Sequence, residues 1–278
     1  MQRKIIKQGN NSYTLTLPID WVRENELDKT LNVNVNREEN SIVISADSTR
    51  KEREITVDMK NKSERLVRVV LNNLYRSGYT KIVIENYKEE KFIDEFVSSR
   101  LLGFEVVKIE KDRLTIKNIA EPSPDNFNSI LRKVFLIIKQ SLEFQIDKET
   151  ANHKVNLYVN YLQRIIVSTK SFGAESNHNM YSITTRLLLI QHSLARMKEK
   201  TILFDETKQL FDDLTTAFFS KNSEKVFEAH DKLSVLNHDS YIKNLKNNNN
   251  SDYFYLGDII RHLYLISTNA IVVLNFRD

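Results

Sequence analysis

The sequence predicts an α+β protein of several domains, in which a small β-rich unit and a mixed α/β unit precede an all-helical bundle. Two observations predict this order. Apolar residues alternate with a period of two in short runs before residue 120, whereas after residue 125 they recur at helical spacing. Two of the three prolines lie within Ala120–Asp125 and separate the two patterns. We therefore expect domains at 1–47, 50–119 and 125–278.

The first unit is expected to have the element order ββαββ. Pro18 cannot donate a hydrogen bond to a strand ladder, so the second strand ends there, and Ile19–Asn25 follows as a short amphipathic helix. About forty-five residues bury little apolar surface by themselves, so the unit is expected to need a partner chain. The strand-prone runs are Ile5–Ile6, Tyr13–Leu17, Leu31–Val35 and Ser41–Ile44.

The middle unit is expected to have the order βαβαββ. Ile55, Val57 and Met59 alternate as a strand, and a helix follows that Ser63 is placed to cap and Gly78 to end. The unit has no glycine-rich loop between a strand and a helix and no histidine, so we expect no nucleotide-binding or catalytic motif in it. The remaining elements are expected at Lys81–Glu85, Glu89–Leu102, Glu105–Ile109 and Leu114–Ile116.

The part of the chain after residue 125 is expected to be helical. Apolar residues at helical spacing, such as Ile130, Val134 and Ile138, predict six helices. The segments Leu188–Ser193 and Tyr264–Asn269 are weakly similar and each follows an arginine, which indicates two repeats of three helices. The six helices are expected at 126–146, 148–171, 179–200, 206–220, 223–246 and 253–275.

The composition excludes several classes of protein. The chain has no cysteine, which rules out disulfides, thiolate metal sites and cysteine nucleophiles and fits a cytoplasmic protein. No run of eighteen apolar residues occurs, and the most apolar stretch, Leu263–Phe276, is interrupted by Ser267, Thr268 and Asn269. The N-terminus has no apolar signal region. We therefore expect a soluble, cytoplasmic chain without membrane insertion.

The net charge of +4 is unevenly distributed along the chain. It is −1 over residues 1–47, +4 over residues 48–120 and +1 from residue 121 onwards, so no domain is a polycation. The first unit nevertheless begins with Arg3, Lys4 and Lys7, and no acidic residue precedes position 20. A local basic edge of this kind suffices for contact with nucleic-acid phosphates.

A set of residues is spread over the predicted strands and the short helix of the first unit: Arg3-Lys4-Ile5, Gly9, Ser12-Tyr13, Leu15-Thr16-Leu17-Pro18, Trp21, Leu27, Val33, Val35 and Ile42-Val43-Ile44. This set resembles the AbrB/SpoVT family, whose swapped-hairpin domain is a dimeric DNA-binding fold. That family usually has glycine before the leucine at Leu27 and a Lys-Gly-Asp turn after it, where this chain has Glu26 and Lys29-Thr30-Leu31. The resemblance therefore implies a small swapped-hairpin β domain with a less tight turn after Leu27.

The helical part resembles the PhoU phosphate-uptake regulators, in which two three-helix bundles lie side by side. The order of domains along the whole chain resembles the archaeal phosphate-uptake regulator family, which combines an AbrB/SpoVT-like N-terminal domain with a PhoU-like bundle. This resemblance implies a homodimeric, DNA-binding transcription regulator of phosphate uptake and phosphate homeostasis.

PhoU-like bundles typically bind metal clusters through acidic E/D-x-x-x-D motifs, since carboxylates suit hard and borderline cations. Where the resemblance places these acids, this chain has Asn152 and Asn156 in the second helix, His192 in the third and Thr268 in the sixth. Neutral amides are weak metal ligands. We therefore expect neither a metal cluster nor another cofactor.

Other candidate sites in the bundle each have a simpler explanation. Glu224 and Glu228 lie one turn apart on a helix face, as in an ordinary ion-paired surface helix, and His192 is also explained as a hydrogen-bonded packing residue. The adjacent acids Asp212 and Asp213 point to different sides of a helix and form no catalytic pair, so we predict that the protein is not an enzyme. The weak candidate metal ligands are His192, Glu224, Glu228 and Asp231.

The resemblance places DNA contacts on the basic arm and the loops of the first unit. Basic side chains would contact phosphates, and asparagine and serine would donate hydrogen bonds. The alternatives are that Lys7 and Arg23 are simply solvated and that Asn10 and Asn11 form a turn that tolerates positive φ. The candidate DNA-binding residues are Arg3, Lys4, Lys7, Asn10, Asn11, Ser12 and Arg23.

Two functions remain open. In the first, a homodimer binds operator DNA through the N-terminal unit while the bundle receives a phosphate-status signal from a partner protein. In the second, the chain is a PhoU-type accessory protein that docks on a phosphate transporter or its signalling partner, and residues 1–47 serve only for dimerisation. Related swapped-hairpin domains also serve as antitoxins or dimerisation units, so the fold by itself does not decide between the two.

Overall fold

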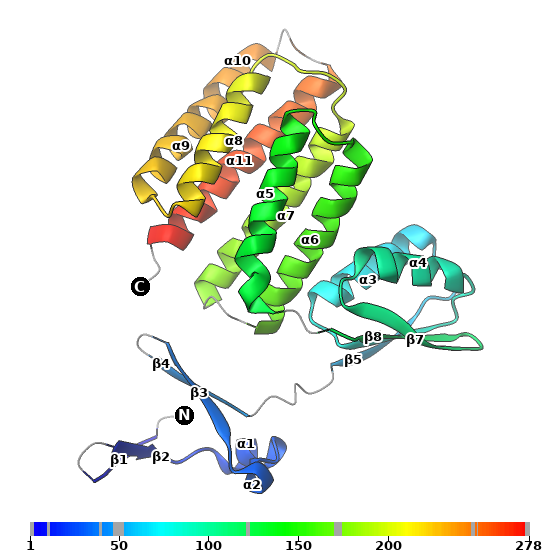
Figure 1. The fold of residues 1–278 in the computed structure, drawn as a ribbon, viewed down its shortest axis with the longest axis vertical. Helices are drawn as coiled ribbons and strands as arrows, with labels where there is room; N and C mark the ends of the chain where they lie inside the picture. The colour runs from blue at the N-terminus through cyan, green and yellow to red at the C-terminus, as the bar shows by residue number, and fades with distance from the viewer. Residues whose placement is uncertain are drawn as a thin grey trace. The chain divides into compact units, whose positions relative to one another are not determined.

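The computed structural model describes residues 3–9, 12–38, 41–46, 53–120, 123–169, 174–245, 248 and 250–275. As the sequence predicts, the protein is α+β. Small N-terminal hairpins precede a mixed four-stranded sheet with helices, and an all-helical region follows (Figure 1). The chain divides into two compact units, Met1–Lys51 and Glu52–Asp278, so the mixed sheet and the helical region belong to one unit.

The N-terminal unit has two antiparallel hairpins, with two short helices between them in the sequence. Pro18 stands at the N-cap of the first helix, which confirms the predicted helix start at Ile19, whereas the second strand ends at Leu15, two residues before the predicted end. The sequence predicts a strand from Leu31, but a second helical turn forms first and the strand begins at Val33. The elements are β1 (Ile5–Gln8), β2 (Ser12–Leu15), α1 (Ile19–Glu24), α2 (Leu27–Thr30), β3 (Val33–Glu38) and β4 (Ser41–Ala46).

The turn after Leu27 is closed by a hydrogen bond although the family's glycines are missing. The Leu31 N–H donates to the Leu27 carbonyl oxygen at 2.8 Å. Glu26 and Leu31, on either side of α2, both have left-handed backbones, with φ of 52° and 51°. A side chain in this conformation costs about 1–2 kcal/mol relative to glycine, so the turn keeps its geometry at some cost in stability.

The middle part of the chain has the predicted βαβαββ order. Its elements are β5 (Glu54–Asp58), α3 (Glu64–Arg76), β6 (Lys81–Glu85), α4 (Glu90–Arg100), β7 (Phe104–Glu110) and β8 (Arg113–Asn118). The strand order is β5-β6-β8-β7, with β5 and β6 parallel and the other neighbours antiparallel. Helices α3 and α4 cover one face of this sheet (Figure 1), where Leu71, Ile82 and Phe96 share a core. Ser63 Oγ accepts a hydrogen bond from the Leu66 N–H, which confirms the predicted cap.

The C-terminal part is helical, although helix ends differ by a few residues from the predicted ones. Its elements are the 3₁₀ turn η1 (Pro124–Asn126), α5 (Phe127–Leu142), α6 (Lys148–Thr169), α7 (Ala174–Arg196), α8 (Phe204–Phe219), α9 (Ser223–Val235), the π-helical turn η2 (Leu236–Ser240), α10 (Tyr241–Leu245) and α11 (Ser251–Asn275). The helix expected at 223–246 corresponds to α9, η2 and α10, which follow one another without a break.

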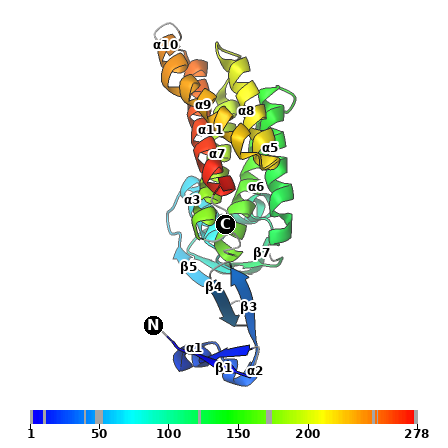
Figure 2. The ribbon, with the colours of Figure 1, turned by 90° about the vertical axis from the view of Figure 1, so that its left-hand side faces the viewer.

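The helices of the bundle share one apolar core. Helices α5, α6 and α7 contact one another, α8, α9 and α11 contact one another, and α7 packs along α11 (Figure 1, Figure 2). Among the described residues, only α11 is long and apolar enough, over Ser251–Leu274, to cross a membrane. Half of that window is buried within the bundle, and Leu256, Ile260 and Leu263 belong to its core, so α11 packs as a core helix.

A buried arginine joins the α/β part to the bundle. Arg164 on α6 is 1% exposed. Its Nη1 donates hydrogen bonds to the carbonyl oxygens of Tyr75 and Tyr79, each at 2.8 Å. Its guanidinium lies over the rings of Tyr75 and Phe104, 5.0 Å and 4.6 Å from their centroids. Arg164 thus satisfies carbonyls at the C-terminal end of α3 and fixes α6 against it.

Candidate functional site

The predicted DNA-binding cations lie at the start of the first hairpin. Arg3 and Lys4 immediately precede β1, Lys7 lies within it, and all three are exposed. None of the three forms an ion pair with another described residue. Their charges are therefore available to an anionic ligand.

The same hairpin presents an apolar face. In the antiparallel register, Ile5 lies opposite Leu15 and Lys7 lies opposite Tyr13. Directly opposed residues share a face of a sheet, as do residues two apart on one strand, so these four side chains lie on the same side. Ile5, Tyr13 and Leu15 are 63%, 65% and 43% exposed. Lys7 therefore stands on a face that a single chain leaves uncovered.

Ser12 closes the turn of this hairpin. Its hydroxyl donates to the Gln8 carbonyl oxygen, which is a local alternative to the predicted donation to DNA. Gly9, within the turn, has a φ of 69°, a conformation that glycine adopts without strain. Asn10 and Asn11, the other predicted donors of this loop, lie outside the described residues.

Arg23 is exposed in the last turn of α1. The Asn25 side-chain amide donates to the Trp21 carbonyl oxygen at 2.8 Å and caps this end of the helix. No described contact brings Arg23 together with the basic residues of the hairpin. Trp21 is half-buried, in keeping with a packing role.

Three of the bundle positions singled out in the sequence come together between α6 and α7. The Asn156 amide lies 3.3 Å from His192 Nε2, and Asn156 Nδ2 donates to the Asn152 carbonyl oxygen at 2.7 Å. Burial holds the pKa of His192 below its usual value, and the charges of Arg196 and Arg76 lower that pKa further. The ring is therefore neutral at neutral pH and suited to share a hydrogen bond with a neutral amide.

Arg76 reaches the same group from α3. Its Nε donates to Asn160 Oδ1 at 2.7 Å, and Asn160 Nδ2 donates to Asn72 Oδ1 at 3.0 Å. Burial lowers the pKa of Arg76. Asn156 and Asn160 are one turn apart on α6, so His192 and Arg76 contact adjacent turns of one helix face. We call the place where α3, α6 and α7 meet the polar junction.

The other weak metal-ligand candidates lie on the surface of the bundle. Glu224, Glu228 and Asp231 are exposed on α9. Thr268 is exposed on α11, and its hydroxyl donates to the Tyr264 carbonyl oxygen at 3.1 Å. Within the part of the chain that the structure describes, no three histidine, aspartate or glutamate side chains are grouped so as to hold a metal ion.

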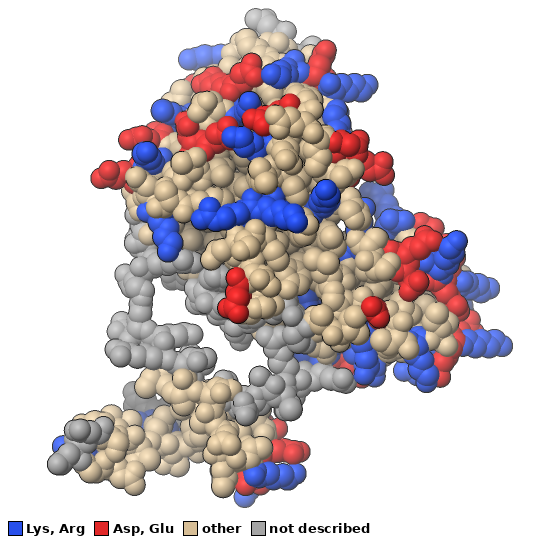
Figure 3. Space-filling view, viewed as in Figure 1, with Lys and Arg blue, Asp and Glu red and all other residues tan. Residues whose placement is uncertain are grey.

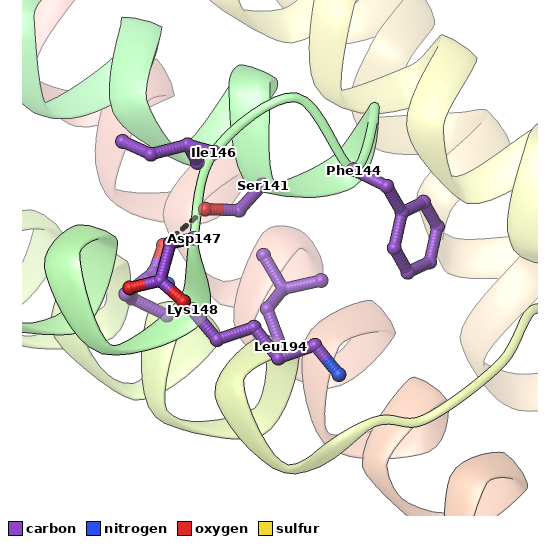
Figure 4. Close-up of a pocket in the computed structure, with 7 residues that line it drawn as sticks. Ser141, Phe144, Ile146, Asp147, Lys148 and Leu194 are labelled. Carbon is purple, nitrogen blue, oxygen red and sulfur yellow. Dashed lines mark hydrogen bonds between the residues drawn. The ribbon is translucent and has the colours of Figure 1, made fainter.

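A pocket of about 290 Å³ opens where the α5–α6 connection meets α7. Its lining consists of Ser141, Phe144, Ile146, Asp147, Lys148, Gln191 and Leu194. Ser141 Oγ donates to Gln191 Oε1 at 3.0 Å (dashed line in Figure 4). Lys148 Nζ donates to the Met197 carbonyl oxygen, and Asp147 caps the start of α6 by accepting a backbone N–H. Both charged groups of the pocket thus have partners within the fold.

The surface charge of the second unit is mixed. On the face shown in Figure 3, basic and acidic side chains are interspersed over the α/β part, and a row of lysine and arginine side chains crosses the bundle. Ion pairs join α5 to α8: Lys139 Nζ lies 3.0 Å from Asp212 Oδ1, and Lys208 Nζ lies 3.4 Å from Glu143 Oε1. These mixed signs agree with the small net charge of the chain from residue 121 onwards.

The central residues of the polar junction are ones that sequence patterns do not single out. Arg76, Asn160 and Arg164 link elements that are far apart in the sequence. Arg164 alone carries a sequence signal, because Leu162, Ile165, Ile166 and Val167 around it are apolar. A charged residue at such a position is buried, and a buried charge needs hydrogen-bond partners.

Comparison with known proteins yields no relative. No family model matches the chain, and neither a curated protein nor a solved structure matches it. A function therefore has to be proposed from the residues and their geometry.

Proposed function

We propose that the protein is a homodimeric DNA-binding transcription regulator of phosphate uptake. The observation that carries the proposal is that the described side chains of the N-terminal unit form almost no core. Among its described side chains only Leu27 is buried, at 5% exposed. A second copy of the chain would cover the remaining apolar surface, since its burial stabilises association. The exposed large hydrophobic residues are Ile5, Ile6, Tyr13, Leu15, Ile19, Leu31, Val35 and Ile42.

Within this proposal the N-terminal unit is a swapped-hairpin dimer of the AbrB/SpoVT type. Two hairpins separated by short helices supply the elements that such a dimer exchanges between chains. The apolar face of β1 and β2 is then buried, and Lys7, which shares that face, extends along it. Arg3 and Lys4, which precede the strand, make the principal phosphate contacts.

The bundle is proposed to be the PhoU-like module that receives a phosphate-status signal from a partner protein. What supports this is the grouping of its helices. One group contains α5, α6 and α7, the other contains α8, α9 and α11, and the third helix of each group packs along its counterpart. Two three-helix repeats would be arranged in this way. The proposal includes no catalytic role and no metal cluster.

The alternative is a PhoU-type accessory protein that docks on a phosphate transporter or its signalling partner. The observation that favours it is the charge of the N-terminal unit, which is −1 over residues 1–47 and leaves only a few cations at one edge for DNA. In this alternative the unit only dimerises the chain.

DNA binding across a salt series tests the proposal. We expect the full chain to bind its own promoter DNA with an affinity that falls as salt rises, because each neutralised phosphate releases counterions. The Arg3→Ala/Lys4→Ala/Lys7→Ala variant should bind more weakly, and the slope should fall by about 1 for each phosphate that is no longer neutralised. A Lys88→Ala/Lys91→Ala variant is the control, since it removes exposed cations of the α/β part.

The same experiment separates the two candidate functions. Absent or salt-independent DNA binding by a dimeric wild-type chain would contradict the proposal of a DNA-binding regulator and favour the accessory protein. Equal weakening by the control variant would show that any loss of positive charge lowers the affinity for DNA. The hairpin edge would then no longer be assigned as the DNA-binding site.

A further inference from the structure

The polar junction holds a half-buried cation without an acidic partner. Arg76 is partly buried where α3 meets α6, and its one partner among the described residues is the neutral amide oxygen of Asn160. A guanidinium carries five N–H donors, of which this bond uses one. A charge that is withdrawn from water is normally compensated by an opposite charge. The remaining donors of Arg76 are therefore suited to an anion that the protein does not itself supply.

A second arginine approaches the same place from α7. The Asn156–His192 contact and the hydrogen bond from Gln163 to Thr185, 2.9 Å long, show that α6 and α7 run antiparallel here. Arg196 lies one turn beyond His192 on α7 and is exposed at the solvent side of the junction. Arg196 follows His192 by one turn of α7, and Arg76 contacts Asn160, one turn along α6 from the Asn156 that His192 contacts, so the two arginines flank the ring along the α6–α7 contact. Both charges lower the pKa of His192.

None of the hydrogen bonds described at the junction involves a carboxylate. On the face of α6 that carries Asn152 and Asn156, the nearest acidic residue in the sequence is Glu149, one turn earlier. Glu149 is exposed and its charge acts on Arg100 of α4. A cation would find only neutral amides and like charges at the junction, whereas an anion would find two guanidinium groups.

We propose that the polar junction binds a tetrahedral oxyanion between the guanidinium groups of Arg76 and Arg196, beside His192. The planar fork of arginine matches the oxygens of phosphate or sulfate and makes paired, charge-assisted hydrogen bonds to them. The bound anion links α3 of the α/β part to α7 of the bundle. The site shares no residue with the DNA-binding edge, so its test is independent of the test of the proposed function.

Isothermal titration calorimetry on the full chain, with inorganic phosphate and sulfate as probes, tests this site. Sodium chloride at equal ionic strength is the comparison. We expect phosphate and sulfate to bind and chloride to give no saturable heat. Arg196→Gln should weaken phosphate binding by about tenfold, as expected for the loss of a hydrogen-bonded charge, and Arg76→Gln should weaken it at least as much. Lys154→Gln, which removes an exposed charge from another face of α6, should bind as the wild type does.

The outcomes are decisive even if the Arg76→Gln variant fails to fold, because Arg196 is exposed and its replacement leaves the core intact. Equal phosphate affinity of wild type and Arg196→Gln would overturn the proposal, as would a chloride response equal to that of phosphate. Glycerol phosphate distinguishes the source of the anion. If glycerol phosphate binds more tightly than inorganic phosphate and Arg196→Gln weakens both, the ligand is an organic phosphate; no binding of any of these anions would overturn the proposal.

Discussion

At the scale of single residues, the backbone at Gly103 decides how the sheet is connected to the bundle. Gly103 follows α4 with a φ of 77°. Its carbonyl oxygen accepts from the N–H groups of Ile119 and Ala120, which lie just after the last strand. A Cβ at Gly103 would lie 2.5 Å from the Ala120 carbonyl oxygen, and a backbone atom held in this way cannot move aside. Only glycine fits both the conformation and the space.

Replacement of Gly103 tests this interpretation. Gly103→Ala should lower the free energy of unfolding by more than about 2 kcal/mol, because left-handed backbone strain adds to the steric clash. Gly78→Ala is the matched control, since Gly78 also has positive φ but its nearest neighbour is the Ser168 hydroxyl, a side-chain atom 3.1 Å away. Denaturant unfolding of both variants would measure the difference. An equal decrease in the two would show that the contact with Ala120 contributes nothing.

At the scale of the element, α6 joins two parts of the second unit because it carries a polar stripe beside the apolar positions that face the core. Asn156, Asn160 and Gln163 hydrogen-bond to α7 or α3, and Arg164 binds the end of α3. The apolar positions of the helix belong to the bundle core. One helix thus fixes the α/β part to the bundle through specific hydrogen bonds rather than through apolar contact alone.

Removal of the Arg164 side chain should reveal this link. In Arg164→Leu the Tyr79 carbonyl oxygen loses its Arg164 donor, and the Tyr75 carbonyl oxygen keeps only backbone donors such as the Gly78 N–H. A buried acceptor left without its partner costs about 1–3 kcal/mol. We expect the free energy of unfolding of the 52–278 unit to fall by at least about 2 kcal/mol. Circular dichroism during denaturation would measure this, with Lys154→Leu on the exposed side of α6 as the control. If the free energy of unfolding decreased no more than in the control, Arg164 would not be what fixes α6 to the end of α3.

At the scale of the whole molecule, the two units of the chain differ in how they are stabilised. The 52–278 unit buries two apolar clusters, one under the mixed sheet and one within the bundle. The N-terminal unit has formed hairpins but a single buried hydrophobic side chain among those described. Hairpins of this size are marginally stable in water unless another surface covers them. The second unit is expected to fold without a partner, and the first is not.

A charge on the apolar face of the hairpin should therefore separate the dimer. Leu15→Asp places a carboxylate beside Ile5 and Tyr13, and its desolvation would oppose association. We expect sedimentation velocity to show a dimer for the wild type and a monomer for Leu15→Asp. Lys91→Asp, a change of exposed charge in the α/β part, should remain dimeric. A monomeric wild type, or dimers in all three, would remove this face from the interface.

Local signals in the sequence predict much of the fold. Pro18 precedes the first helix and Ser63 caps a later one, because each acts on backbone groups within a few residues of itself. The sequence does not predict the helical turn α2. Glu26 and Leu31 adopt left-handed conformations that their side chains disfavour, so no local residue pattern indicates the turn. The cluster of Arg3, Lys4 and Lys7 is visible in the sequence because its members are neighbours there. The polar junction is not visible in the sequence, because Arg76 and Asn160 are 84 residues apart.

The order of the elements, the exclusion of cysteine chemistry and the basic start of the first hairpin all follow from the chain alone, since periodicity, composition and adjacency are properties of the chain. Which side chains share a face or a site depends on the tertiary structure. It placed Lys7 among exposed apolar residues through the strand register, and it brought Arg76, His192 and Asn156 to one face of α6. Such groupings depend on how elements pack, and packing is determined by the whole core together rather than by any segment of it.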